Sequence, residues 1–290
     1  MLKMWGLNSL TEYLFIDSGG TKTIAYLYSG KVIKSIKLSG GSVSAYGLKR
    51  AANVISKIPR LLGILRTDAI VISLAGIDSE TYRRRAEAEI SQRLSPYSSK
   101  VVIEHDAHVV LLSNADRGVV VIAGTGSIAY GYDGMRRYVR GDRGWLVGDF
   151  GSGFWIGRET LRELLAELQG LSEKSLISKL IPFTEEELVR FLYENSCNIG
   201  KVASFSKPLL RAVEMGDQKA YRILNDAMRK LADQALSLCK MLREDKLYYH
   251  GGMFASKTYT RFFTSYLKEK GINAIPSSDL IKGFVKLASS

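Results

Sequence analysis

The same short pattern occurs twice in the chain, and this repetition constrains the fold more than any other feature. Residues 15–30 read FIDSGGTKTIAYLYSG and residues 121–134 read VIAGTGSIAYGYDG, so both contain Ile-Ala-Tyr-x-Tyr-x-Gly. In each copy an apolar run ends in a glycine-rich turn and a second run follows, which is typical of a β-hairpin. The copies lie about 100 residues apart, far more than a solenoid period. The sequence therefore predicts two related α/β domains.

The order of the predicted elements repeats with the pattern. Residues 13–38 alternate apolar and polar positions and read as three strands, followed by helix, buried strand, helix and buried strand. The second of these helices, SETYRRRAEAEISQRL, is expected to begin with Ser79 as its N-cap. After residue 117 the order begins again with another three-stranded meander.

The length of the chain suits two domains that each bury their own core. We expect an N-terminal domain over residues 1–112, on which a closing helix at 279–290 packs back. The C-terminal domain is expected over residues 113–278, with a helical insert at 171–243.

The chain is basic, with 41 Lys and Arg against 29 Asp and Glu and a formal net charge of +12. Such a balance can indicate nucleic-acid binding. The basic residues are spread along the sequence, however, and no cluster of them interleaves with aromatic residues that could stack on bases. We expect no nucleic-acid partner, and a basic surface that mildly attracts anionic ligands.

No segment offers the ~18 uncharged apolar residues of a membrane span, and the first ten residues do not read as a signal peptide. We therefore expect a cytoplasmic protein without a membrane partner. Cys197 and Cys239 form no Cys-x-x-Cys pair and have no nearby His at ligand spacing. This argues against a zinc site or a disulfide framework, and favours two buried free thiols.

The glycine-rich turns expose backbone where an anion could bind. In Gly-Gly-Thr-Lys-Thr no Cβ blocks the approach of phosphate oxygens to the N–H groups. The motif is not a Walker P-loop, because G-x-x-x-x-G-K-[ST] is absent and a strand follows. One such turn is more often just a tight hairpin turn. Two turns at equivalent places favour a polyphosphate held between both domains, sequestered when they close.

Asp17 marks a difference between the two copies. We align it with Ala123, so a carboxylate is not needed to form the turn. A hard cation such as Mg²⁺, held through one or two carboxylates plus substrate phosphates, would explain it. The alternative is an aspartate that bonds to the backbone of its own turn, and the spacing alone does not choose between them.

Asp106 follows the carboxyl end of a buried strand in VVIEHDAHV, where open α/β sheets present their chemistry. Phosphoryl transfer needs a group that accepts the proton of the attacking hydroxyl, and a carboxylate suits this task. The alternative is a helix cap. His105 and His108 flank Asp106, and we expect both to point elsewhere and to be structural.

These motifs resemble those of the sugar kinase, actin and Hsp70 ATPase (ASKHA) superfamily. They are most similar to the branch with N-acetylglucosamine kinases, broad-specificity hexokinases and the BadF/BadG-type activator ATPases. FIDSGGTKT resembles the first phosphate motif of the branch, VIAGTGS the second, and YYHGGM the adenosine motif. The resemblance covers nearly the whole chain and implies ATP between two ribonuclease-H-like domains that face a central cleft. It implies that Asp17 acts through Mg²⁺ and that Asp106 is the catalytic base beside the sugar. The residues implied to bind ATP are Gly19, Gly20, Thr21, Lys22, Thr23, Gly124, Thr125, Gly126, Ser127, Gly251 and Gly252.

RGWLVGDFGSGFWIGRETL resembles the sugar-side loop of this branch. Trp145 would offer an apolar face to a pyranose ring or an acetyl group, and Asp149 would accept hydrogen bonds from sugar hydroxyls. The alternative is a core Trp in a glycine-rich loop before a helix that Ser152 caps. Residues 39–47 resemble another sugar-contacting loop, in which Ser44 replaces the usual Asn and has one donor where the amide has two.

We therefore expect an ATP-dependent sugar kinase that phosphorylates a hexose or N-acetylhexosamine, at the 6-hydroxyl, as a homodimer. A BadF-type activator ATPase is one alternative. It would need two cysteine ligands for a [4Fe-4S] cluster beside the nucleotide motifs, and Cys197 and Cys239 lie 42 residues apart in the helical insert. A sensor that binds ATP and sugar without turnover is the other, and the presence of both Asp17 and Asp106 speaks against it.

Overall fold

The computed structural model describes residues 11–77, 79–195 and 198–290. The signal-peptide prediction for the first ten residues and the prediction of a buried thiol at Cys197 therefore lie outside the described residues. The chain divides into two compact units. Unit 1 comprises Met1–Val109 with Leu280–Ser290, and unit 2 comprises Val110–Asp279.

Unit 1 contains a five-stranded sheet in the order β3-β2-β1-β4-β5. The first three strands form an antiparallel meander, and β4 and β5 continue the sheet in parallel with β1. The strands are β1 (Tyr13–Ser18), β2 (Lys22–Ser29), β3 (Lys31–Ser39), β4 (Ala69–Leu74) and β5 (Val101–His105). The helices are α1 (Val43–Tyr46), α2 (Leu48–Ser56), α3 (Ile58–Leu62), α4 (Glu80–Leu94), α5 (Asp106–Leu112), which continues into unit 2, and α13 (Ile281–Ser289).

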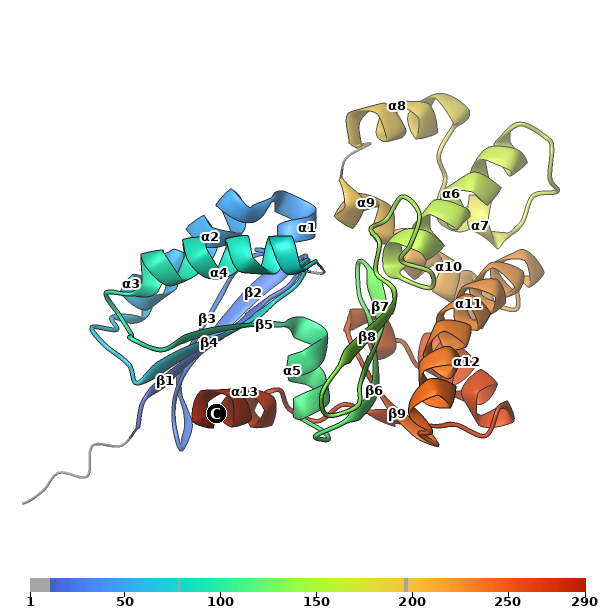
Figure 1. Ribbon diagram of the computed structural model, residues 1–290. Helices are drawn as coiled ribbons and strands as arrows, with labels where there is room; N and C mark the ends of the chain where they lie inside the picture. The colour runs from blue at the N-terminus through green and yellow to red at the C-terminus, as the bar shows by residue number, and fades with distance from the viewer. Residues whose placement is uncertain (1–10, 78, 196–197) are drawn as a thin grey trace, which may run out of the picture. The chain divides into compact units, whose positions relative to one another are not determined.

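Both faces of this sheet are covered, which explains why β4 is buried along its whole length and is apolar at every position except Ser73. Side chains of α2 and α4 pack with Leu14 and Ile16 on one face, and Figure 1 shows these helices together on that side. On the other face α13 packs against Phe15, whose ring stacks on that of Phe284 at 5.1 Å. The Ser79 hydroxyl accepts from the Tyr82 N–H and so caps α4, as the sequence predicts.

Unit 2 repeats the same topology, with the order β10-β9-β6-β7-β8. A meander of three antiparallel strands is again extended by two parallel strands. The strands are β6 (Gly118–Ala123), β7 (Ser127–Tyr132), β8 (Arg137–Gly141), β9 (Lys246–His250) and β10 (Asn273–Pro276). The helices are α6 (Gly153–Leu168), α7 (Leu176–Leu180), α8 (Glu185–Asn195), α9 (Ile199–Ala203), α10 (Ser206–Glu214), α11 (Gln218–Leu242), α12 (Lys257–Glu269) and the 3-10 helix η1 (Gly252–Ala255).

The core of unit 2 forms between one face of its sheet and the long helices α6, α11 and α12. Leu224, Leu231 and Leu238 recur along α11 at helical spacing, and all three are buried. Ser152 caps α6 by accepting from the Trp155 N–H, as expected. Two α/β units with the same strand order confirm the predicted fold class.

The strand register corrects one detail of the alignment between the copies. Ile24 and Ile128 each begin the repeated Ile-Ala-Tyr pattern and are therefore equivalent. Ile24 pairs with Asp17 across the first hairpin, and Ile128 pairs with Ile122 across the second. Asp17 therefore corresponds to Ile122, whereas Ala123 corresponds to Ser18. The first turn is one residue longer than the second, which shifted the alignment. The conclusion that the hairpin does not need an acid is unchanged, because Ile122 also lacks a carboxylate.

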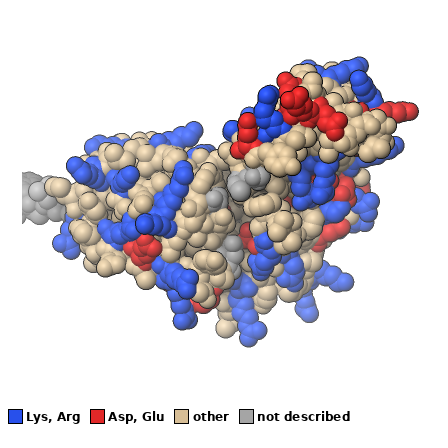
Figure 2. Space-filling view, turned by 90° about the horizontal axis from the view of Figure 1, so that it is seen from above, with Lys and Arg blue, Asp and Glu red and all other residues tan. Residues whose placement is uncertain are grey.

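Figure 2 shows Lys and Arg side chains scattered over the visible face rather than gathered in one stripe. A polyanion such as nucleic acid is bound by clustered charge, so this face offers no obvious platform for it. In the described part of the chain, none of the helices combines the length and the apolar character that crossing a membrane requires.

Candidate functional site

The first glycine-rich turn leaves two successive N–H groups available to a ligand. The Gly19 N–H donates to the Lys22 carbonyl at 3.0 Å and closes the turn between β1 and β2. Within the described residues, the N–H groups of Gly20 and Thr21 have no acceptor. The side chains of Thr21 and Lys22 are exposed, whereas Thr23 is buried and its hydroxyl lies 3.1 Å from that of Ser18. The turn thus offers two amides, a hydroxyl and an ammonium group to an anion.

The second turn has the same construction. The Gly124 N–H donates to the Gly126 carbonyl at 2.9 Å, and the N–H groups of Thr125 and Gly126 have no acceptor among the described residues. Ser127 differs from the prediction, because both of its donors are used within unit 2. Its N–H donates to Asp149 Oδ1 at 3.2 Å and its hydroxyl donates to the Phe150 carbonyl at 2.8 Å. Ser127 therefore anchors the turn, and Thr125 and Gly126 supply its open donors.

Asp17 lies at the end of β1, where its Oδ1 accepts from the Ser73 hydroxyl at 3.0 Å. Burial, followed by the charge of Asp106, raises the pKa of the Asp17 carboxyl to about 6, although the Ser73 hydrogen bond and Lys22 oppose the shift. The Asp17 carboxylate thus accepts from a side chain of the neighbouring strand β4 and not from the backbone of its own turn. Ser73 was missed in the sequence, where a single hydroxyl in the apolar strand AIVISL was the available signal.

Asp106 is the first residue of α5 and is partly exposed. Its Oδ1 accepts from the adjacent Ala107 N–H at 2.8 Å. Nδ1 of the buried His105 lies 3.0 Å from the same oxygen, so the expectation that His105 points away from Asp106 is wrong. The reason is that β5 passes into α5 without a loop, and this tight change of direction brings consecutive side chains together.

The segment that leads to Ser44 is held directly on the first turn, and Ser44 itself lies in the short helix α1 rather than in a loop as predicted. The Gly19 carbonyl accepts from the N–H groups of Gly41 and Ser42, each at 3.2 Å. A Cβ on Gly40 would lie 2.2 Å from the Gly20 carbonyl oxygen, so only glycine permits this approach. Ser44 is exposed, with its hydroxyl 2.9 Å from that of Ser42. Asp17, Asp106, the first turn and helix α1 with Ser44 are thus all positioned by unit 1.

Trp145 and Asp149 belong to a loop of unit 2 that precedes α6. The Trp145 indole is 37% exposed and packs on Phe154 with a distance of 5.4 Å between the ring centroids. Trp145 is therefore not a core residue, although Phe154 supports one side of its ring. Asp149 is buried, and its carboxylate lies against Gly126 and Ser127. The sequence therefore identified a loop that the structure places beside the second turn.

Gly251 and Gly252 follow β9 and differ sharply in their surroundings. Gly251 has φ +112°, and a Cβ there would lie 2.3 Å from the Ala123 carbonyl oxygen. This places the predicted adenosine motif against the end of β6, directly before the second turn. Gly252 is exposed, and a Cβ there would meet nothing within 4 Å.

The two glycines give a matched pair of substitutions. Gly251→Ala is expected to cost about 2 kcal/mol or more of unfolding free energy, because it adds backbone strain to a clash with β6. Gly252→Ala should change the free energy of unfolding by less than about 0.5 kcal/mol. Any loss of ATP affinity in this variant would then come from contact between the added methyl group and the bound nucleotide. Urea unfolding of both variants checks this, and equal stability would show that Gly251 is not needed for packing.

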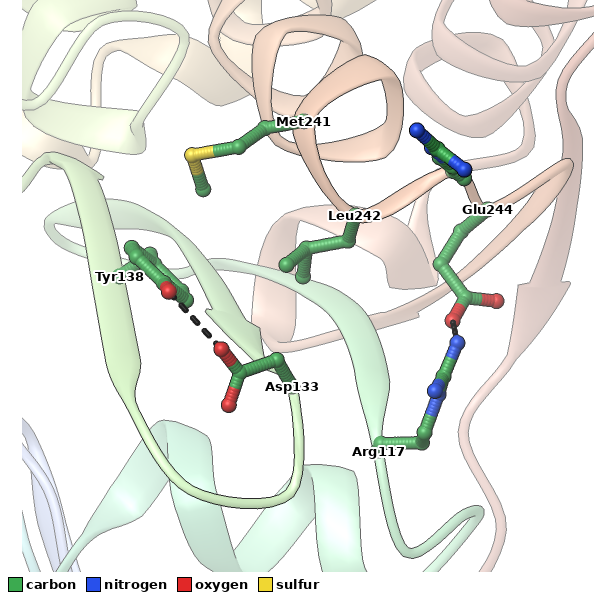
Figure 3. A pocket seen from close by; sticks show the side chains of 7 residues that line it. Arg117, Asp133, Tyr138, Met241, Leu242 and Glu244 are labelled. Atoms are coloured by element: carbon green, nitrogen blue, oxygen red, sulfur yellow. Dashed lines mark hydrogen bonds and ion pairs between the residues drawn. The ribbon is translucent and has the colours of Figure 1, made fainter.

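A separate pocket of about 220 Å³ lies at the other end of the unit 2 sheet, between the β7–β8 hairpin and the end of α11. Figure 3 shows that polar side chains of its lining contact one another in pairs. The Tyr138 hydroxyl donates to Asp133 at 2.8 Å, and Arg117 pairs with Glu244 at 3.4 Å. Because these groups already have partners, the turns remain the better candidates for ligand binding.

Comparison with known proteins gives a consistent set of relatives. Residues 14–282 match the profile of the BadF/BadG/BcrA/BcrD ATPase family. The N-acetyl-D-glucosamine kinase of Dictyostelium discoideum is 28% identical over 301 residues, which cover 93% of this chain and 92% of that protein. The N-acetylmuramic acid/N-acetylglucosamine kinase of Clostridium acetobutylicum is 28% identical over 232 residues, covering 74% and 75%.

Among solved structures, a candidate N-acetylglucosamine kinase from Chromobacterium violaceum superposes with a TM-score of 0.79. It is 18% identical and covers 96% of this chain and 99% of that chain. A glucokinase from Streptomyces griseus in complex with glucose and AMPPNP, of the ROK family, has a TM-score of 0.59 at 14% identity, covering 96% and 98%. At these identities the structures support the fold.

Proposed function

The chain belongs to the BadF/BadG/BcrA/BcrD ATPase family, and we propose that it is an ATP-dependent sugar kinase. It transfers the γ-phosphoryl group to a hydroxyl of a hexose or N-acetylhexosamine. The observation that carries the proposal is the repeated turn, which in each unit leaves two successive N–H groups open, while unit 1 adds Asp17 and Asp106. The substrate class is supported by a relative named N-acetyl-D-glucosamine kinase, which matches this chain over nearly the whole length of both proteins.

The nucleotide is bound by glycine-rich backbone. Gly20 and Thr21 in unit 1, and Thr125 and Gly126 in unit 2, donate N–H groups to phosphate oxygens, and Lys22 adds a positive charge. Gly19, Thr23, Gly124 and Ser127 contribute by holding the turns in shape. Gly251 and Gly252 give the adenosine close access to the backbone.

Mg²⁺ fits the acidic end of β1. Asp17 is a carboxylate whose charge is disfavoured by burial and by Asp106, so a cation nearby would compensate it. Mg²⁺ commonly binds through one or two carboxylates together with substrate phosphates, which agrees with the described residues offering no cluster of three or more His, Cys, Asp or Glu for a metal. Bound there by Asp17, the ion would neutralise phosphate charge.

Asp106 is the general base. Its carboxylate accepts the proton of the sugar hydroxyl while the hydroxyl oxygen attacks the γ-phosphorus, and the bond to the β-phosphate oxygen of ADP breaks. A primary hydroxyl, the 6-hydroxyl of a hexose, reaches such a base most easily because it extends from the ring. The partly exposed position of Asp106 leaves room for this approach.

The acceptor is selected by few groups. Trp145 presents a partly exposed indole, Asp149 stands at the same loop, and the exposed Ser44 supplies a hydroxyl. A pocket with one apolar face discriminates weakly, by about 1–3 kcal/mol per hydrophobic group, unless a buried polar partner enforces the choice. The enzyme should therefore use N-acetylglucosamine and also glucose, mannose or glucosamine.

Trp145→Ala tests this specificity. It is expected to lower kcat/KM for N-acetylglucosamine by roughly 10- to 100-fold and to affect glucose less, because the acetyl methyl loses its apolar neighbour. The measurement is kcat/KM for all four sugars with both proteins. Leu146→Ala, at an exposed position of the same loop, is the control. Turnover of an alcohol outside the sugars, with none of the four accepted, would contradict the hexose assignment and leave the kinase intact.

An activator ATPase is the second candidate, and the surroundings of Cys239 argue against it. This thiol is buried in α11, and burial raises its pKa to about 12. Cluster ligation requires an accessible thiolate, which Cys239 does not provide. Purified protein that carries iron and sulfide would support the activator function instead.

A homodimer and a cytoplasmic location complete the proposal, as the resemblance to this branch of kinases implies. A sensor without turnover is disfavoured, because Asp17 and Asp106 are retained and influence each other in unit 1. Finding ATP-dependent phosphorylation in the sugar panel excludes the sensor.

A further inference from the structure

Asp149 has an unusual position for a residue that only contacts substrate. It is 8% exposed, and its backbone has φ 57°, in the left-handed region that side chains other than Gly, Asn and Asp rarely adopt. Its Oδ1 accepts from the Ser127 N–H at 3.2 Å. The carboxylate is thus directed back to the second phosphate turn, 22 residues earlier in the chain.

The same turn is tied by two further hydrogen bonds to the start of α6 and by a third to Phe150 in the loop before it. The Gly124 carbonyl accepts from the Gly153 N–H at 2.8 Å, and the Thr125 carbonyl accepts from the Phe154 N–H at 3.1 Å. The Ser127 hydroxyl donates to the Phe150 carbonyl. Trp145 packs on Phe154. The Trp145 loop and the turn therefore form one connected structure.

We propose that Asp149 is a positioning residue that fixes the second phosphate turn through the Ser127 N–H and couples it to the Trp145 loop. This deepens the proposed function and rests on it. With Ser127 held by Asp149, the open N–H groups of Thr125 and Gly126 keep their direction toward phosphate. Sugar binding at the loop then changes phosphate binding at the turn through this carboxylate, which acts beside the backbone hydrogen bonds that also join the two segments.

Gly126 supports this assignment independently. A Cβ on Gly126 would lie 3.1–3.3 Å from all three atoms of the Asp149 carboxyl group. No strained φ requires glycine there, so its role is to leave space for the carboxylate. Gly126→Ala should push the Asp149 carboxylate away from the Ser127 N–H while leaving every backbone donor of the turn in place.

The direct test is amide hydrogen exchange of residues 124–128 in the ligand-free protein. Asp149→Asn tolerates the left-handed backbone but removes the charge from the hydrogen bond. Exchange at Ser127 should rise about tenfold or more, and affinity for Mg²⁺-AMPPNP without sugar should fall by a similar factor. Asp142→Asn is the matched control, because Asp142 lies in the same loop with φ 49°; it should change neither quantity.

A double-mutant cycle with Gly126→Ala completes the test. Each single substitution should weaken AMPPNP binding, and the double variant should be little worse than either, since both break the same contact. Gly126→Ala also provides the measurement if Asp149→Asn does not fold. Unchanged exchange and unchanged AMPPNP affinity, with only N-acetylglucosamine binding reduced, would overturn the proposal. Failure of the parent protein to phosphorylate any sugar would instead overturn the kinase assignment, which the exchange measurement does not depend on.

Discussion

Asp106→Asn is expected to lower kcat by roughly 10²- to 10⁴-fold while leaving ATP binding and the fold intact. The amide keeps the size of the side chain and can still accept from the Ala107 N–H, which the carboxylate does at 2.8 Å. It cannot take the proton of the attacking hydroxyl. Single-turnover phosphorylation of N-acetylglucosamine, with AMPPNP affinity measured alongside, checks both parts.

Asp106→Ser separates catalysis from helix capping. Serine is a good residue at the start of a helix, so a purely structural Asp106 would be replaced without loss of activity. If Asp106 is the base, Asp106→Ser should be as inactive as Asp106→Asn although α5 is preserved. Wild-type kcat in Asp106→Ser would reduce Asp106 to a cap.

Asp17→Asn is expected to abolish most Mg²⁺-dependent activity and at the same time to stabilise the protein. The pKa of Asp17 is raised from 3.8 to about 6, so ionising it costs free energy in the folded state. Each pKa unit corresponds to about 1.4 kcal/mol, and removal of the charge should therefore add about 1–3 kcal/mol to the unfolding free energy at pH 7.5. A stable but inactive variant is the pattern of a residue retained for function.

The sign of this effect fixes its pH window. Well below pH 3.8 Asp17 is protonated in both the folded and the unfolded protein, so it does not lower the free energy of unfolding. As the pH rises toward 6 the unfolded chain ionises while the folded protein still holds the proton, so the stability of the parent protein falls relative to Asp17→Asn. The difference levels off once the pH is well above 6 and the folded carboxyl is ionised as well. Urea unfolding of both proteins across this range gives the difference directly.

Metal binding should follow the same titration. Because Mg²⁺ requires the ionised carboxylate, its binding releases a proton and should weaken as the pH falls through 6. Mg²⁺ titrations of activity for the parent protein and Asp17→Asn, at saturating sugar, measure this. Identical Mg²⁺ curves for the two proteins would show that Asp17 does not serve the metal.

Local features of the sequence determined the elements and their order. Hairpins at both glycine-rich turns follow from alternation and from turn residues, and the Ser79 and Ser152 caps follow from helix-start chemistry that involves only a few neighbouring residues. The duplication, the open donors at Gly20 and Thr125, and the position of Asp106 after a buried strand were predictable for the same reason. The duplication is visible in the residue types alone, and the other two features depend only on the backbone of a few neighbouring residues.

Contacts between distant segments were decided only by the tertiary structure. Ser73 reaches Asp17 across 56 residues because β1 and β4 are neighbours in register, and Asp149 reaches Ser127 because the Trp145 loop folds back on the turn. The raised pKa of Asp17 likewise comes from burial and from Asp106. Hydrogen bonds, desolvation and Coulomb interactions depend on distance in space. The periodicity of residue types along the chain does not specify the distances between residues that are far apart in the sequence.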